Sequence, residues 1–411
     1  GINLTVYPVA GTKIVSLSGT VDAGERYDPP GKSGSSILNV ALMNGSSTVI
    51  TATKSRELQA DNGLTMSDLL KFEPGRDLVY FQTTLLKEDL DTHLKLISHH
   101  LRFPNLKESR FADAIARSNS YVRSRNRQVR NRLEGHLLRS LLDNKSPYSP
   151  ENTAVLLNSI NHLSIQDIES FRKKTIQPES LHVVAVGDTT INEMETLLNM
   201  AFKDWKKEGE VNPPVVKESS RKVLKVMVSY DGESEVLLGK LEDRDNATSL
   251  SLINCALFSH PWLARLPVER FGSQVKPSLR EIGEKNLWSV DMKGSEKNIE
   301  EAFFSMRKAL HKLKNGGIKP DELKSLKSYL TGKTLLTEFK DLTSASGFIA
   351  KNSQMEVFPG KFEPLVSKLE STTDSIVNNF LTNSFSPEES CLIFALNKKS
   401  RNLPRRLNLH K

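Results

Sequence analysis

Cysteine is almost absent from this sequence, which has only Cys255 and Cys391 among its 411 residues. Two cysteines exclude a disulfide framework and a metal site built from thiolates. Both lie in apolar stretches, INCALF and ESCLIFAL, where we expect buried structural thiols. No run of about 18 apolar residues is present either, so the sequence predicts no membrane span, and no signal-peptide pattern stands at its start.

Aromatic residues make up only 7% of the chain, but 37% of the residues are hydrophobic and 26% are charged. That composition is typical of a globular protein with packed cores. A length of 411 residues is too great for one ordinary core and favours two domains of about 200 residues. The chain begins at Gly1 without a methionine, and a strand pattern follows at once, so we expect a processed or excised segment.

A net charge of +8 raises the question of nucleic-acid binding, because clustered Lys and Arg side chains gain binding energy by releasing phosphate counterions. The clearest cluster is RSNSYVRSRNRQVRNR, residues 117–132. No aromatic platform, zinc finger or RNA-binding signature accompanies these arginines, so we expect no nucleic-acid partner. A basic groove for peptide carboxylates or acidic side chains is at least as natural a use of the charge.

The strand and helix patterns form two halves of similar length, each with strands followed by helices, which indicates an internal duplication. Residues 206–222 are charged, contain two prolines and few large apolar groups, and therefore predict a linker. The predicted domains are 1–205 and 223–411.

Some individual elements have clear signals. We expect a long charged helix over 111–142, and a helix that begins after Ser164, because Asp167 follows at capping distance. A further helix is expected from Pro320. Ahead of the strand pattern at 286–294 we expect a loop with basic residues.

Six segments occur in an order that resembles the pitrilysin and insulinase family of zinc metallopeptidases, and specifically its half-length two-domain units. They are AGERYDPPGKSG (23–34), LKEDLDTHLKLISHHLRFP (86–104), SPYSPEN (146–152), LSIQDIESFRKKTIQPESLHVVAVGD (163–188), AFKDW (201–205) and NGGIKPDELKSLKSYLTGK (315–333). The resemblance implies an α+β fold of two homologous domains, each a mostly antiparallel sheet with helices packed on it. Together they would form one half of a clam-shaped chamber.

Active members of that family carry an inverted zinc motif, H-x-x-E-H, on the helix after the GKSG-like turn. A glutamate on a later helix is their third ligand. The matching position of that glutamate is near 117–120, where this chain has no carboxylate. The positions that match the motif itself offer no zinc ligand of this kind: Ser36, Ile37, Asn39, Val40 and Ala41. We therefore expect no catalytic residue and no metal in this chain, with zinc held by an active partner half.

Other sites are poorly supported by the sequence. The GKSGSS segment lacks the spacing of a phosphate-binding loop, and no G-x-S-x-G elbow is present. A relocated metal site at His93, His99 and His100 would need a nearby carboxylate to complete it, and packed or surface histidines are the plainer interpretation.

The segment LREIGEKNLWSV, residues 279–290, resembles the part of the family that completes the cleft with an arginine and a tyrosine. The resemblance matches Arg280 to that arginine. It matches Trp288 to the tyrosine, but one residue out of step and without the hydroxyl. We expect both to support peptide binding, with a surface charge and a core anchor as the alternative interpretation.

The resemblance thus implies a non-catalytic half or subunit of a pitrilysin-like metalloendopeptidase. Such a half closes the chamber and helps to bind peptide substrates for an active partner that carries H-x-x-E-H. The alternative is a structural subunit, like the core proteins of respiratory complex III. Independent peptidase activity would require zinc ligands that the sequence does not have. The bacterial periplasm and the mitochondrion are the compartments that the resemblance suggests.

Overall fold

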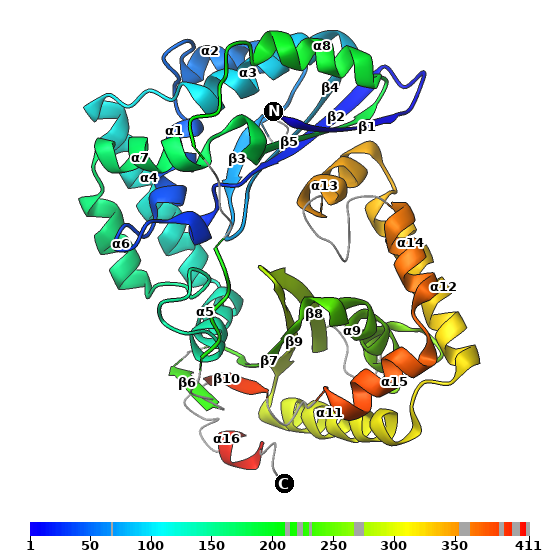
Figure 1. Cartoon of the computed structure of the whole chain (residues 1–411). Coiled ribbons are helices and arrows are strands. Elements are labelled where there is room, and N and C mark those ends of the chain that lie inside the picture. The colour runs from blue at the N-terminus through cyan, green and yellow to red at the C-terminus, as the bar shows by residue number, and fades with distance from the viewer. Residues whose placement is uncertain are drawn as a thin grey trace.

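The computed structural model describes residues 1–66, 69–209, 214–219, 225–229, 232–266, 275–352, 362–385, 390–396 and 403–407. The two halves of the chain form two lobes, the first half at the top of Figure 1 and most of the second half below it. Each lobe is built on one five-stranded sheet with helices packed against it.

The two sheets have the same topology. The first has the order β1-β5-β2-β4-β3 and the second has the order β6-β10-β7-β9-β8, so adding five to each strand number converts one into the other. In each sheet one described strand pair, β1–β5 or β6–β10, is parallel and the other pairs are antiparallel. The predicted fold class, two related and mostly antiparallel domains, is confirmed. The strands are β1 (Asn3–Pro8), β2 (Ile14–Val21), β3 (Lys71–Pro74), β4 (Val79–Leu86), β5 (Leu181–Gly187), β6 (Lys225–Ser229), β7 (Ser234–Asp243), β8 (Val275–Ile282), β9 (Lys285–Gly294) and β10 (Cys391–Leu396).

Two helix starts follow the local sequence signals. Ser164 caps α7 by accepting a hydrogen bond from the Asp167 N–H, and Asp167 completes the capping box. Pro320 is the first residue of α12, where its missing N–H costs nothing. The α-helices are α1 (Ser35–Met43), α2 (Ala52–Asp61), α3 (Leu90–Arg102), α4 (Glu108–Arg127), α5 (Val129–Leu141), α6 (Thr153–His162), α7 (Ile165–Thr175), α8 (Ile191–Ala201), α9 (Ala247–Asn254), α11 (Glu296–Gly316), α12 (Pro320–Glu338), α13 (Leu342–Asn352), α14 (Phe362–Ser371), α15 (Asp374–Asn383) and α16 (Leu403–Arg406).

Two predictions about individual elements were wrong, and one strand was not predicted. The helix expected over 111–142 is two helices, α4 and α5, separated at Gln128, whose backbone is extended. Asn131 stabilises the break, because its amide donates to the Arg125 carbonyl near the end of α4, which also accepts from the Gln128 N–H. The expected basic loop before β9 contains strand β8, and strand β3 had no predicted counterpart. Both of these strands lie at sheet edges and contain a proline, which weakens their sequence signal.

Each half supplies one helix to the sheet of the other half. Helix α13 packs on β2 and β5 of the first sheet, and α5 packs on β7 and β10 of the second. Figure 1 shows α13 beneath the first sheet and α5 beside β6 and β10. A Cβ on Gly347 of α13 would lie 2.9 Å from the Tyr80 hydroxyl oxygen, and one on Gly239 of β7 would lie 2.4 Å from Leu137 of α5, so glycine permits both close approaches. The two halves are therefore interlocked.

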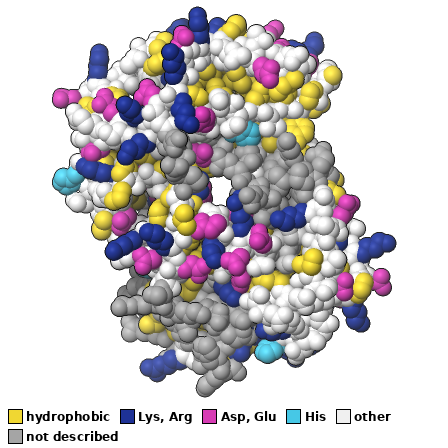
Figure 2. Space-filling model, viewed as in Figure 1, with side chains coloured by type: hydrophobic (Ala, Val, Ile, Leu, Met, Phe, Trp, Pro, Cys, Tyr) yellow, Lys and Arg dark blue, Asp and Glu magenta, His cyan; other side chains and the backbone are white. Residues whose placement is uncertain are grey.

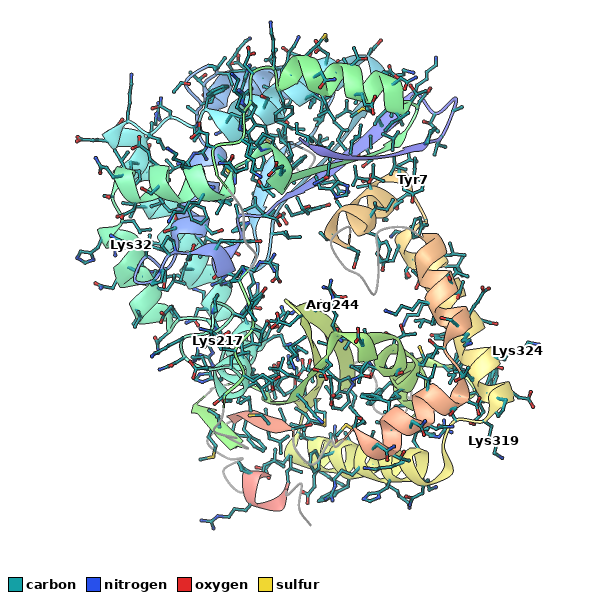
Figure 3. All side chains as sticks on the ribbon, in the orientation of Figure 1. Tyr7, Lys32, Lys217, Arg244, Lys319 and Lys324 are labelled. Atoms are coloured by element: carbon teal, nitrogen blue, oxygen red, sulfur yellow. The ribbon has the colours of Figure 1, made fainter. Side chains whose placement is uncertain are left out.

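The interface under α13 combines an apolar cluster, formed with Val184 and Val186 of β5, with a set of buried hydroxyl groups. Strand β2 places Val15 and Leu17 in the core of the first half, and the alternate residues Ser16 and Ser18 face α13. The hydroxyl of Ser346 lies 2.8 Å from the hydroxyls of both Ser16 and Ser18. Tyr7 of β1, labelled in Figure 3, packs beside the same helix.

Both cysteines are buried and free, as expected for structural thiols. Burial raises the pKa of each thiol to about 11, which keeps both thiols protonated at neutral pH. None of the helices in the described ranges combines the length and the apolar character that a membrane crossing needs.

Candidate functional site

The GKSG turn positions the start of α1. The Asp28 carboxylate accepts hydrogen bonds from the Gly34 N–H at 2.6 Å and the Ser36 N–H at 2.8 Å. Gly34 has a φ of 91°, and a Cβ there would lie 2.4 Å from Ile160 of α6. Lys32, labelled in Figure 3, forms an ion pair with Asp167 at 2.9 Å. These contacts fix the start of α1 against α6 and α7.

Apolar side chains that pack in the interior occupy two of the positions that match the zinc motif. Ile37 is buried against Val122, Leu156 and Ile160, and Val40 belongs to the core of the first half. Among the described residues, no three His, Cys, Asp or Glu side chains gather where they could hold a metal ion.

Two arginines donate hydrogen bonds to polar groups of α1. The guanidinium of Arg117 on α4 donates to the Ala41 carbonyl at 3.0 Å, at the position matched to the third zinc ligand. Arg172 donates to the side-chain oxygen of Asn39 at 2.6 Å. Helices α1 and α4 pack together as a zinc site of this family would require, but the groups between them are apolar or cationic.

Two of the three histidines of α3, His93 and His100, are buried and make polar contacts within the first half. The ring of His100 lies 2.9 Å from both the Met43 carbonyl oxygen and the Ser55 hydroxyl, and His93 contacts the Asp89 carbonyl at 3.1 Å. Burial lowers the pKa of both rings, and that of His99, which keeps them neutral. His93 and His100 thus make separate polar contacts within the first half.

Arg280 lies where the two halves meet. It is on β8 of the second half, and its guanidinium pairs with Glu134 of α5 in the first half at 2.7 Å. Arg76, in the turn between β3 and β4, approaches the same carboxylate oxygen at 3.8 Å. Burial raises the pKa of Glu134, but the charges of Arg280 and Arg76 outweigh it and bring that pKa below its ordinary value. Glu134 is therefore an anion that holds two cations.

Trp288 does not share a face with Arg280. In the β8–β9 register Trp288 is opposite Leu279, and Arg280 is opposite Leu287, so the two side chains point to opposite faces of the sheet. Trp288 is 0% exposed. Its indole N–H donates to the Asn254 side chain at 2.8 Å, and its ring packs edge-on against Phe385 with centroids 5.1 Å apart. The structure gives it the position of a core anchor, and a role in peptide binding stays a prediction.

Two hollows adjoin this junction. One has a volume of about 780 Å³ and is lined by the GKSG turn, the SPYSPEN loop, Arg76 and Arg125. The other, of about 430 Å³, is lined by one side of α5 together with Arg76, Arg125 and Arg280. Figure 2 shows charged side chains of both signs where the two lobes meet.

Sequence reasoning found Arg280 but missed its partners. Glu134 and Arg76 are 58 positions apart in the sequence and neither belongs to a motif. The arginine-rich run 117–132 was the one sequence signal for charged contacts in this region. Its Arg125 forms a two-pronged ion pair with Glu25. Arg130 of the same run pairs with Asp291 of the second half at 3.1 Å.

Known proteins show where this architecture occurs. A comparison with curated proteins gives no match. Residues 162–330 match the family described as the peptidase M16 inactive domain. The resemblance to the pitrilysin and insulinase peptidases is thereby confirmed.

Solved structures share this fold over nearly the whole length of the chain. A protease from Helicobacter pylori superposes with a TM-score of 0.80 and 18% identity, over 96% of this chain and 97% of that one. A peptidase M16 inactive domain from Pseudomonas fluorescens superposes with a TM-score of 0.77 and 14% identity, over 97% and 96% of the two chains. The periplasmic protease PqqL from Escherichia coli has a TM-score of 0.75 and 12% identity; 99% of this chain covers 47% of that protein. This chain therefore spans about half the length of that longer protein.

Proposed function

We propose that this chain is the non-catalytic half of an M16 metalloendopeptidase, which closes the chamber around a peptide for a partner half that carries H-x-x-E-H. The observation that supports it most is the state of α1. The helix that holds zinc in active members is present and well packed, but Ile37, Val40 and Ala41 or their neighbours occupy the positions that match its H-x-x-E-H motif. A zinc peptidase needs three protein ligands, so the catalytic metal of such an assembly belongs to the partner.

Arg280 is the residue that we assign to substrate. Its side chain is 39% exposed and it lines the hollow of about 430 Å³. A guanidinium has five N–H donors, and the Glu134 carboxylate can engage only some of them. The remaining donors can bind a peptide carbonyl, or the oxyanion that forms when a zinc-bound water attacks it. Glu134 acts as a positioning residue that fixes the guanidinium.

A structural subunit is the second candidate, and one observation favours it. The Arg280–Glu134 pair joins β8 to α5, so a purely structural role, in which it holds the two halves together, also accounts for it. A guanidinium used only in this way would have no effect on peptide turnover.

Reconstitution tests the proposal. The purified chain is mixed with an M16 subunit of the same organism that carries H-x-x-E-H, and the mixture is analysed by size-exclusion chromatography, elemental analysis and cleavage of a fluorogenic peptide. We expect a one-to-one complex, zinc only in the partner, and faster cleavage than by the partner alone. One tightly bound zinc per isolated chain, or a complex that forms without changing cleavage, would contradict the proposal.

A further inference from the structure

The hollow of about 430 Å³ beside α5 has an unusual wall. Five arginines and two glutamates contribute to it, so cationic groups outnumber anionic ones by three. Side-chain amides and a hydroxyl supply further hydrogen-bond donors. The polar residues are Arg76, Arg125, Asn126, Asn131, Arg132, Glu134, His136, Arg139, Glu151, Asn152, Thr153 and Arg280.

Helix α5 has two distinct faces. Leu133, Leu137 and Leu138 are buried in the cluster that joins α5 to the second sheet. Arg132, His136 and Arg139 follow each other at steps of four and three residues, which places them together on the face that lines the hollow. The leucines, with the ion pairs of Arg130 and Glu134, attach α5 to the second half, and none of these contacts involves Arg132, His136 or Arg139.

The charges inside the hollow are unevenly balanced. Glu134 is shared by Arg76 and Arg280, and Arg125 is paired with Glu25. At the other end of the hollow, burial lowers the pKa of Arg139, and the charge of Glu151 only partly offsets this.

The pKa of His136, on the same face of α5, is lower than that of an ordinary histidine. Burial lowers its pKa, and the nearby Arg139 and Arg132 lower it further. The imidazole is therefore neutral, and the positive charge at that end of the hollow comes from Arg132 and Arg139, which lie about one helical turn before and after it on the same face of α5.

We propose that this hollow is a binding site for a peptide carboxylate, with Arg132 and Arg139 as its principal contacts. The planar fork of an arginine matches a carboxylate in a two-pronged geometry, and the amide of Asn152, which also lines the hollow, can donate to the same group. The two glutamates of the wall favour a ligand with a single negative charge over a doubly charged phosphate. The inference goes beyond the proposed function, because such binding requires no partner half.

The carboxylate can come from an acidic side chain or from the end of a peptide. Two peptides distinguish the sources: Ac-Gly-Glu-Gly-Glu-Gly-NH2 has only side-chain carboxylates, and Ac-Gly-Gly-Gly-Gly-Gly-OH has only a terminal one. The matched neutral probe is Ac-Gly-Gln-Gly-Gln-Gly-NH2. Isothermal titration calorimetry of the isolated chain measures Kd for each.

We expect at least one acidic peptide to bind and the neutral peptide not to bind. The double variant Arg132→Gln/Arg139→Gln should weaken binding at least tenfold, as loss of charge-assisted hydrogen bonds predicts. Arg123→Gln is the matched control, because Arg123 is an exposed arginine of α4 outside the hollow. It should leave Kd unchanged.

A second variant tests the site by a gain of affinity. Glu134→Gln removes one of the two carboxylates that line the hollow and so makes the potential there more positive, which should tighten binding of the acidic peptide about two- to fivefold. The proposal is overturned if neither acidic peptide binds, if the neutral peptide binds as well as they do, or if Arg132→Gln/Arg139→Gln and Arg123→Gln give the same Kd. If the double variant fails to fold, an unchanged or weaker Kd in Glu134→Gln overturns it instead.

Discussion

Arg280 of β8 and Glu134 of α5 form an ion pair of 2.7 Å between the two halves of the chain. It lies beside a helix that the first half lends to the sheet of the second, and α13 makes the reciprocal contact. The junction is thus held by exchanged helices and by a partly exposed charge pair. The helices carry most of the stabilisation, because a pair with this much solvent exposure contributes about 0–1 kcal/mol.

The exchange predicts how the linker responds to proteolysis. Residues 214–219 are tied to α5, with the Ser219 N–H donating to Leu141 and the Asp143 N–H to Lys217; Figure 3 shows Lys217 beside that helix. Cleavage within 206–222, the predicted domain boundary, should yield two fragments of about 200 residues that stay together on a native sizing column. They should separate only in denaturant. Fragments that part without denaturant would show that α5 and α13 do not interlock the halves.

The position of Trp288 predicts a stability effect. Trp288→Ala should cost about 3–5 kcal/mol of unfolding free energy, as other large aromatic deletions in cores do. Trp288→Phe keeps the ring but leaves the Asn254 oxygen unpaired, which costs about 1–3 kcal/mol. Urea unfolding measures both. Trp262→Phe is the control, since Trp262 is 90% exposed. If Trp288→Phe lost no more unfolding free energy than this control, Trp288 would not be a core residue.

A carboxyl pair under α5 predicts a pH effect. Burial, and then the charge of Asp291, raise the pKa of Glu235, although Arg130 and Lys293 act in the opposite direction. A raised folded-state pKa means that the folded chain keeps a proton that the unfolded chain releases. That contribution is present below the ordinary glutamate pKa and is lost as the pH rises through the folded-state value.

Glu235→Gln removes this titration. The variant should therefore gain about 1 kcal/mol in unfolding free energy over the parent at pH 8, and the gain should shrink towards pH 5. Urea unfolding at the two pH values provides the measurement. Parallel pH dependences of the variant and the parent would show that Glu235 ionises normally.

The local elements were predictable because their signals are local. Ser164 and Asp167 define the start of α7 within four residues, and the buried strand at 181–187 is a continuous apolar run. The break at Gln128 was not predictable, because the helix pattern continues through it. The docking of α5 on the second sheet and the hydrogen bond from Asn131 to the Arg125 carbonyl favour an interruption there.

The candidate site was predictable only in part. The loss of the zinc ligands can be read directly from positions 36–41, and Arg280 from its resemblance to a family motif. Strand phase decides that Trp288 points away from Arg280, and this required the β8–β9 register. The Glu134 contact joins elements 146 positions apart, and no local pattern encodes such a pairing.

The central claim is that this chain completes the cleft of an active partner, and Arg280→Ala in the reconstituted enzyme tests it most directly. Folding and association should be unchanged, because the side chain is 39% exposed. Peptide cleavage should fall about 10- to 1,000-fold in kcat if Arg280 stabilises the transition state, and a loss confined to KM would place it in ground-state peptide binding. Arg123→Ala should have no effect. Equal turnover by the Arg280→Ala, Arg123→Ala and parent complexes would contradict the claim and leave the structural-subunit interpretation in its place.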